Sequence, residues 1–355
     1  MYYINPFIEK LVRIYPEGDR SGFLRLDMNE NPEGLPEDFV KTCKSYIDSS
    51  FISSYPNRES LITTLSQYHD LPGNNFCITD GSEMAIKYIF EVFGEKDKKV
   101  VTVNPTFEMY GVYCNMFGLK HITYDIPENF EINIEDFINL IDTDTCLVCL
   151  LHPNNPVGGS YSKEDIIRII NKANENSAVV VIDEAYHYFC KSTIIDIVND
   201  YDNVIVLRTF SKLFSLASCR IGYAVACPKI ATLLNKVRPT FDTNSFALLF
   251  AEMVLKDKEI KSKLIDIERE GRLYLIEKLK ENNYQYYYGE GNYIFIKPKN
   301  NKRNVIEKMY NKKILIKNYN KGILKDYIRI NTGSVNVMKK FFDIFIAIDQ
   351  DEKNI

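Results

Sequence analysis

The middle of the chain alternates short apolar runs with longer segments in which apolar positions recur at helical spacing. Seven runs are typical of buried strands, at residues 76–79, 100–103, 121–125, 146–151, 178–182, 204–207 and 221–226. Helical spacing occurs between them, at residues 83–93, 107–117, 134–140, 162–175 and, more weakly, 193–199. This alternation predicts an α/β fold, with a mostly parallel seven-stranded sheet covered by helices on both faces. Ligands of such sheets bind beyond the carboxyl ends of the strands.

The pattern changes after Arg238-Pro239, where a long helical pattern runs over residues 244–280. Shorter elements follow it, with strands predicted at 293–296, 314–316 and 327–330 and helices at 304–309 and 337–348. This succession is typical of a small α+β domain. We therefore expect an N-terminal arm over residues 1–28, a large domain over 29–238 and a small C-terminal domain over 239–355.

Composition and charge narrow the class of protein further. Of the 355 residues, 45% are hydrophobic and 26% are charged, with a net charge of −4, which is ordinary for a globular protein. Acidic and basic residues are interspersed, so we expect no nucleic-acid partner. No apolar run approaches the roughly 20 residues that span a bilayer, and the first residues lack a signal-peptide pattern. We therefore expect a cytoplasmic protein without a membrane partner.

The cysteines and histidines do not predict a metal site. The eight cysteines are scattered, and several lie in apolar runs where cysteine behaves as a small hydrophobe. Cys146 and Cys149 form a C-x-x-C pair, but residues three apart on a strand face opposite sides. The four histidines show no ligand spacing. We expect no bound metal.

The stretch that follows the run 204–207 carries the strongest candidate chemistry. Lys212 lies there among small and apolar residues, which is a poor setting for a surface charge. Burial and nearby cations lower the pKa of a lysine, and a neutral amine can form a Schiff base with an aldehyde. Thr209, Ser211 and Arg220 are suitable donors for a phosphate, so the stretch suggests pyridoxal phosphate. Taken alone, an ordinary strand-to-loop crossing fits Lys212 equally well.

Four other strand-like runs also end in residues that suit this cofactor: Gly81-Ser82-Glu83, Phe107, Asn155 and Asp183. A carboxylate at a buried strand end needs a cationic partner, and a pyridinium nitrogen would be one. Backbone N–H groups at a helix start suit a phosphate. Each feature alone has an ordinary explanation as a cap, a turn, a solvated carboxylate or a core aromatic. Their occurrence at successive strand ends favours a single site.

Nine short motifs extend this pattern over nearly the whole chain: Leu26-Asp27-Met28-Asn29-Glu30-Asn31-Pro32, Tyr55-Pro56, Asp80-Gly81-Ser82-Glu83, Asn104-Pro105-Thr106-Phe107, Pro153-Asn154-Asn155-Pro156, Asp183-Glu184-Ala185-Tyr186, Arg208-Thr209-Phe210-Ser211-Lys212, Arg220-Ile221-Gly222-Tyr223 and Arg329-Ile330-Asn331-Thr332-Gly333. Together they resemble the fold type I, class I/II PLP-dependent aminotransferases. The resemblance is greatest to histidinol-phosphate aminotransferase, and it implies that family's fold, with a large PLP-binding domain and a small C-terminal domain.

The resemblance implies three catalytic residues. Lys212 would form the Schiff base with the cofactor and then carry a proton between the substrate Cα and the cofactor. Asp183 would keep the pyridine nitrogen protonated, which makes the ring an electron sink. Tyr186 would bond the phenolic oxygen of the ring together with Asn155, and Phe107 would stack on the ring face.

The resemblance also implies a phosphate site and a shared dimer site. The phosphate would be held by the residues Gly81, Ser82, Glu83, Thr209, Ser211 and Arg220. Tyr55 would reach the phosphate of the neighbouring subunit's cofactor, which implies a homodimer with shared active sites. The substrate would meet Arg329, a clamp for its carboxylate, together with Asn29, Tyr15 and Lys317.

Three positions depart from the pattern of histidinol-phosphate aminotransferases, and two of them, Tyr188 and Lys317, are expected at the substrate end. The third is Val157, which stands where the family has the threonine of a Pro-Thr-Gly turn. Tyr188 stands where the family often has an acidic residue, and Lys317 stands where an arginine is common near the substrate phosphate. The implied function is transfer of an amino group between a small phosphorylated amine, amino acid or ketone and the glutamate/2-oxoglutarate pair.

Alternatives to that function remain open from the sequence. One is a transaminase of another phosphorylated ketone, for example in surface-polysaccharide supply. A second is a decarboxylase of a phosphorylated amino acid, similar to threonine-phosphate decarboxylase and acting for example on phosphoserine. A third is a PLP-binding domain without catalytic activity, which the presence of Lys212, Asp183 and Arg329 disfavours.

Overall fold

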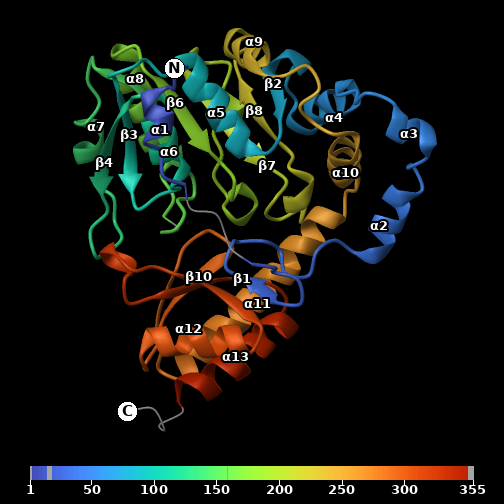
Figure 1. Cartoon of the computed structure of the whole chain (residues 1–355), viewed down its shortest axis with the longest axis vertical. Coiled ribbons are helices and arrows are strands. Elements are labelled where there is room, and N and C mark those ends of the chain that lie inside the picture. Colours follow the sequence, from blue (N-terminus) through green and yellow to red (C-terminus); the bar gives the residue numbers. More distant parts are fainter. Residues whose placement is uncertain (1, 14–17, 158, 351–355) are drawn as a thin grey trace.

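The computed structural model describes residues 2–13, 18–157 and 159–350. A seven-stranded sheet has the order β2-β8-β7-β6-β5-β3-β4 and lies in the upper part of Figure 1. Its strands are β2 (Phe76–Thr79), β3 (Lys99–Asn104), β4 (Lys120–Asp125), β5 (Thr145–Leu151), β6 (Val179–Asp183), β7 (Val204–Thr209) and β8 (Gly222–Ala226). Only β8 runs antiparallel to its neighbours, so the predicted mostly parallel sheet is confirmed.

The central strands are stabilised because their apolar residues pack on both faces of the sheet. Along β5, Val148 and Leu150 belong to the apolar cluster on one face of the sheet, whereas Leu147 and Cys149 belong to the cluster on the other. The first face is covered by α4 (Glu59–His69), α7 (Ile134–Ile138), α8 (Lys163–Glu175) and α10 (Ser245–Lys256). The second is covered by α5 (Ser82–Phe93), α6 (Met109–Phe117) and α9 (Pro228–Val237). Polar groups are therefore concentrated at the strand ends.

A five-stranded sheet with the order β1-β11-β12-β10-β9 forms the lower part of Figure 1. Its strands are β1 (Leu24–Leu26), β9 (Gln285–Tyr288), β10 (Tyr293–Lys297), β11 (Ile314–Asn318) and β12 (Ile328–Asn331). It packs with α11 (Ile260–Glu281), α12 (Lys302–Asn311) and α13 (Val335–Asp349) around a separate apolar cluster. β1 pairs with β11, so a segment near the N-terminus lies in this C-terminal sheet.

Two expectations about local structure were wrong. The helical pattern 244–280 is two helices, because the Asp257 side chain accepts hydrogen bonds from the N–H groups of Glu259 and Ile260, and so starts α11 after α10 has ended. The weak pattern 193–199 is a short 3-10 turn, η3 (Ile195–Ile197). β9 was not expected, because its half-exposed tyrosines lack a clear alternation.

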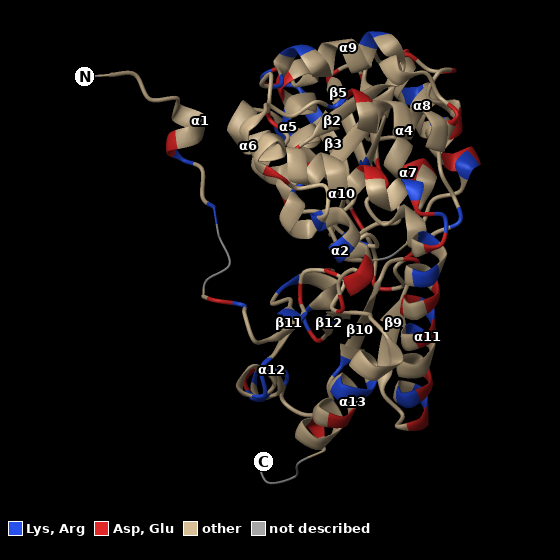
Figure 2. Ribbon diagram, turned by 90° about the vertical axis from the view of Figure 1, so that its right-hand side faces the viewer, with Lys and Arg blue, Asp and Glu red and all other residues tan. Residues whose placement is uncertain are grey.

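The remaining helices are short or peripheral. They are α1 (Pro6–Glu9), α2 (Glu37–Lys44), α3 (Ser49–Ser53), η1 (Gly73–Asn75), η2 (His187–Phe189), η4 (Ala217–Cys219) and η5 (Gly322–Leu324). Figure 2 shows α1 at the outer side of α6. Among the described residues, no helix is both long and apolar enough to cross a membrane. The division into an arm and two domains stays a prediction.

Candidate active site

The expected cofactor residues stand in one row along one edge of the large sheet. The carboxyl ends of β2, β7, β6, β5 and β3 meet at this edge together with the start of β8. In the order of the strands, the row holds Gly81, Arg220, Lys212, Asp183, Asn155 and Phe107. Residues that span positions 81 to 220 therefore stand along one sheet edge. We call this edge the crevice, because ligands of parallel sheets bind beyond the carboxyl ends of the strands.

Lys212 lies just beyond β7 with its amine turned inward. Its Nζ donates a hydrogen bond to the Met28 carbonyl oxygen at 3.2 Å and lies 5.7 Å from the centre of the Tyr186 ring. Burial, and then the positive charge of Arg329, lower the pKa of Lys212 to about 8. A substantial fraction of this amine is neutral near pH 8, which is the form that attacks an aldehyde.

Asp183 ends β6 as a buried carboxylate whose side chain is not in an ion pair with any described residue. It is 2% exposed, and its two oxygens accept from the Tyr110 hydroxyl at 3.2 Å and the Ala185 N–H at 3.1 Å. Burial raises its pKa to about 6, and these two hydrogen bonds and the charge of Lys212 only partly oppose the rise. A cation that donates a hydrogen bond would stabilise this carboxylate, and a protonated pyridine nitrogen has that chemistry.

The start of α5 forms a cradle of anion-binding shape. Gly81 has a φ of +78°, and a Cβ added there would lie 2.8 Å from Nη2 of Arg220, so the guanidinium lies directly over the loop. A Cβ added at Gly222 would lie 2.6 Å from the backbone nitrogen of Ser82, so only glycine permits β8 to approach this turn. Helix N–H groups, a guanidinium and nearby hydroxyls at Thr209 and Ser211 suit the phosphate of pyridoxal phosphate.

Two amide side chains and a phenol join the row to the small sheet. Asn155 Oδ1 accepts from Nη1 of Arg329 at 2.7 Å, which leaves the NH₂ group of Asn155 as its donor toward the crevice. Asn29 Nδ2 donates to the Tyr186 hydroxyl at 2.8 Å and lies 3.5 Å from Asn155 Oδ1. Burial raises the pKa of Tyr186 to about 12, so the phenol stays protonated and can donate to an oxygen.

The expected substrate residues meet on neighbouring strands of the small sheet. Lys317 on β11 and Arg329 on β12 are register partners, so both side chains leave the same face. Arg329 is 4% exposed and also donates to the Tyr319 hydroxyl at 2.9 Å and to the Asp27 carbonyl at 2.7 Å. Among the described residues, the Lys317 ammonium has no hydrogen-bond or ion-pair partner. Tyr15 lies outside the described residues.

The other expected residues have the following surroundings. Phe107 is half-buried and stands edge-to-face on Tyr110, with ring centres 6.0 Å apart. Tyr55 is 79% exposed and stacks on Phe241 at 4.4 Å, a contact that involves none of the row residues. Within one chain, the structure therefore does not bring Tyr55 to the crevice.

Tyr188 was expected at the substrate end, and its contacts do not support that placement. Its ring packs edge-to-face on Phe214 at 4.8 Å and lies 5.9 Å from the Arg208 guanidinium carbon. Arg208 and Glu184 form a buried ion pair at 2.6 Å beside it. Tyr188 is therefore part of this buried cluster.

Sequence reasoning missed three residues that shape the site. Tyr110 bonds the Asp183 carboxylate, and its signal was the aromatic position one helical turn after Phe107. Gly222 belongs to the motif Arg220-Ile221-Gly222-Tyr223, which does not reveal its close approach to the backbone of Ser82. Asn154 is fully buried and joins two loops, since it accepts from the Thr106 hydroxyl at 2.7 Å and donates to the Pro105 carbonyl at 2.9 Å. No local pattern distinguishes such an asparagine from a turn residue.

The chain's family is shown by comparison. Residues 21–345 match the family model described as aminotransferase class I and II. The chain therefore belongs to the class I and II aminotransferases and is a PLP-dependent aminotransferase of fold type I, so the predicted fold, cofactor and reaction class are confirmed.

Individual relatives within this family show which aminotransferases the chain is similar to. A histidinol-phosphate aminotransferase of Thermoanaerobacter pseudethanolicus is 36% identical over 278 residues, which is 78% of each chain. The fold superposes on the histidinol-phosphate aminotransferase of Sinorhizobium meliloti in complex with pyridoxal-5′-phosphate, with a TM-score of 0.88, 20% identity and 98% of each chain covered. It also superposes, with a TM-score of 0.76 and 17% identity, on L-threonine-O-3-phosphate decarboxylase of Porphyromonas gingivalis, over 91% of this chain and 98% of that one.

Proposed function

We propose that this aminotransferase transfers the amino group of a small phosphorylated amine, histidinol phosphate or a close analogue, to 2-oxoglutarate. The observation that carries the proposal is the pairing of Lys317 with Arg329 across β11 and β12. A guanidinium binds a carboxylate in a bidentate fashion, and a second cation beside it suits the phosphate of the other substrate. The similarity to histidinol-phosphate aminotransferases supports this choice of substrate.

When bound, pyridoxal phosphate supplies an electron sink that weakens the bonds to the substrate Cα. In the proposed site Asp183 would pair with the pyridine nitrogen, and Asn155 and Tyr186 would donate hydrogen bonds to the phenolic oxygen. Phe107 would pack against the ring. Lys212 would serve as the base for the proton on the substrate Cα and, once protonated, as the acid, and an amine that is partly neutral near pH 8 suits both roles.

The proposed phosphate site uses the cradle at the start of α5. The donors are the backbone N–H groups of this turn and the side chains of the residues Ser82, Thr209, Ser211 and Arg220, with Gly81 and Glu83 supplying backbone. Because the crevice is at a helix start, the helix dipole adds to the attraction for the dianion. Asn29, Lys317 and Arg329 are proposed to contact the substrate, and Tyr15 remains in the same proposal.

We also propose a cytoplasmic homodimer with shared active sites. The support is the exposed Tyr55, which stacks on Phe241 on the surface and would reach the partner's phosphate site. Two mixed dimers test this proposal: one pairs a Tyr55→Phe subunit with a Lys212→Ala subunit, and the other pairs a wild-type subunit with a subunit that carries both changes. If the sites are shared, the intact Lys212 lies beside an intact Tyr55 only in the first dimer, so we expect the affinity for pyridoxal phosphate to be higher there. Equal affinities would contradict shared sites.

The substrate proposal is tested by incubating the PLP-loaded enzyme with histidinol phosphate and 2-oxoglutarate. We expect glutamate to form in equal amount to the ketone product, without release of CO₂. Unphosphorylated histidinol serves as the matched control and should react at least about tenfold more slowly, since it lacks the group that a cation would bind. Release of CO₂ from phosphoserine or phosphothreonine, without glutamate formation, would instead identify a decarboxylase.

A further inference from the structure

Four successive backbone carbonyl groups beside the active site each accept a hydrogen bond from a different side chain. We call residues 27–30, which carry them, the strap. The four bonds are Arg329 Nη2 to Asp27 O at 2.7 Å, Lys212 Nζ to Met28 O at 3.2 Å, Asn292 Nδ2 to Asn29 O at 3.2 Å and Asn331 Nδ2 to Glu30 O at 2.8 Å. A segment without regular secondary structure thereby has all four carbonyl groups paired.

The two asparagine donors are deeply buried and come from the small sheet. Asn292 is 2% exposed and precedes β10, while Asn331 is fully buried at the end of β12. Asn331 Nδ2 also lies 3.5 Å from the Arg25 carbonyl, so it joins both ends of the turn that follows β1. A buried amide bonded to backbone fixes that backbone, because breaking the bond would leave polar groups without a partner.

The strap itself has a conformation that needs support. Asn29 lies at its centre with a φ of +57°, a left-handed conformation that asparagine tolerates better than most residues. This conformation turns its side chain to the Tyr186 hydroxyl while its carbonyl meets Asn292. On the outer side, Arg20 forms ion pairs with Asp27 at 2.6 Å and Glu30 at 2.9 Å. The strap is therefore held from both sides.

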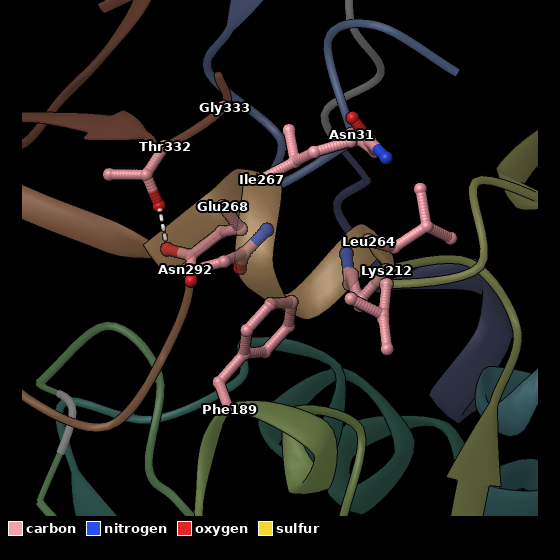
Figure 3. A pocket seen from close by; sticks show the side chains of 10 residues that line it. Asn31, Phe189, Lys212, Leu264, Ile267, Glu268, Asn292, Thr332 and Gly333 are labelled. Atoms are coloured by element: carbon pink, nitrogen blue, oxygen red, sulfur yellow. Dashed lines mark hydrogen bonds between the residues drawn. The ribbon is translucent and has the colours of Figure 1, made fainter. Parts of the chain in front are cut away.

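A small hollow separates Lys212 from the residues behind the strap. It is lined by Lys212, Asn31, Asn292, Glu268 and Thr332 among others, and its volume of about 10 Å³ is near the lower limit for holding one water molecule. Figure 3 shows Thr332 bonded to Glu268 on one side of the hollow and Lys212 on the other. On the strap side, Met28 O is the acceptor that sets the direction of the free Lys212 amine.

We propose that Asn292 and Asn331 are positioning residues of the aminotransferase reaction, which act by holding the strap. By fixing Asn29, they fix the hydrogen bond that the Asn29 side chain donates to the Tyr186 hydroxyl. By fixing the Met28 carbonyl, they fix the position of the free Lys212 amine. The inference rests on the proposed role of Lys212 as the Schiff-base lysine and proton carrier. Because proton transfer depends on placement to within about 1 Å, loosening the strap should slow catalysis by about 10²-fold.

The test measures Lys212 directly in the apoprotein, without substrate or cofactor. Competitive labelling with trace acetic anhydride, read by mass spectrometry of the Lys212 peptide across a pH series, gives the reactivity of this amine. Exposed Lys41 serves as the internal reference. The charges of Arg329 and Arg220, which lower the pKa of Lys212, and of Glu30 and Asp183, which raise it, are unchanged by the variants.

The variants are Asn292→Leu and Asn331→Leu, which keep the side-chain size and remove the donor. We expect the amine of Lys212 to lose its fixed acceptor and to label at least threefold faster than in the wild type near pH 7.5. In the PLP-loaded enzyme, kcat should fall by at least tenfold with KM for the amine within threefold. Asn292→Ser replaces the leucine variant if that variant does not fold.

The matched control is Asn203→Leu. Asn203 is also a buried asparagine whose Nδ2 bridges two carbonyl groups, those of Ile170 at 3.3 Å and Ala178 at 3.1 Å, but it lies away from the strap. The Asn203→Leu variant should lose thermal stability and keep the wild-type labelling of Lys212. Unchanged labelling in folded Asn292 and Asn331 variants would overturn the inference. Borohydride reduction that attaches pyridoxal phosphate to another lysine would overturn the proposed role of Lys212 instead.

Discussion

The cofactor side of the crevice and its substrate side are assembled from the chain in different ways. Asp183 ends β6 and Lys212 lies just beyond the neighbouring β7, so the pairing of these two buried strands places both residues. Arg329 and Asn29 come from segments about 300 positions apart and meet at the side chain of Asn155, while Arg329 also bonds the backbone carbonyl of Asp27. The first side is rigid because the sheet is buried on both faces, whereas the second depends on a few polar contacts.

This difference has a chemical consequence. The strand-end side carries the two groups whose shifted pKa values suit proton transfer near neutral pH. The pKa of Lys212 is lowered to about 8, and that of Asp183 is raised to about 6. Burial is the first cause of both shifts, so they follow from where the strands end. On the other side, specificity depends on which cations face the crevice, and a change there can alter the substrate without disturbing the fold.

The largest expected effect is the loss of Lys212. Lys212→Ala should reduce transamination by about 10⁴-fold or more, the upper end of what a positioned proton-transfer group contributes. The rate is measured by glutamate formation, and circular dichroism checks that the fold is kept. Addition of a small primary amine should restore part of the rate, because it can replace the missing base. A variant with near wild-type activity would contradict the assignment.

The next effect concerns Asp183. Asp183→Asn keeps the size and the hydrogen bond from Tyr110 but removes the charge that stabilises a protonated ring nitrogen, so kcat should fall by about 10²–10³-fold. Glu95→Gln is a control that removes a carboxylate outside the row and should leave kcat unchanged. If kcat of the Asp183 variant remained within twofold of the wild type, the carboxylate would have no role at the ring.

A smaller effect is expected on the substrate side. Lys317→Leu should lower kcat/KM for the phosphorylated amine by about tenfold, a loss of about 1.4 kcal/mol that suits one partly exposed charge contact. The value for glutamate should change less than threefold, because Arg329 remains. Steady-state kinetics with each substrate separate the two. Equal losses for both substrates would remove the proposed division between a phosphate cation and a carboxylate clamp.

The smallest effect is on the stability of the apoprotein. Because the folded state lowers the pKa of Lys212 from 10.5 to about 8, the charged lysine destabilises the fold below about pH 8, and this penalty is lost as pH rises toward 10.5. Lys212→Met should therefore raise the free energy of unfolding at pH 7 and bring a smaller gain at pH 10. Urea denaturation at the two pH values measures the difference. A gain that is equal at both would show that the pKa is not shifted.

Much of the cofactor side could be predicted from local pattern. Apolar runs of strand length, each followed by a residue such as Asp183 or Lys212, place those residues at one sheet edge because parallel strands end together. The roles of Tyr110 and Gly222 could not be predicted from local pattern, because they arise from distant contacts. Tyr110 contacts Asp183, 73 positions away, and Gly222 contacts Ser82, 140 positions away. The break between α10 and α11 was also missed, since a single capping aspartate interrupts an otherwise continuous helical pattern.

On its own, the sequence determined the parallel sheet, the row of strand-end residues and, through its motifs, the PLP-dependent aminotransferase family. These depend on hydrophobic periodicity and short spacings, which are local properties of the chain. Only the tertiary structure decided that the strap of residues 27–30 joins β1 to both Lys212 and Arg329, and that Tyr188 belongs to a buried cluster. Such contacts depend on how distant segments pack, and a buried asparagine that holds a backbone carbonyl has no signature in the residues beside it.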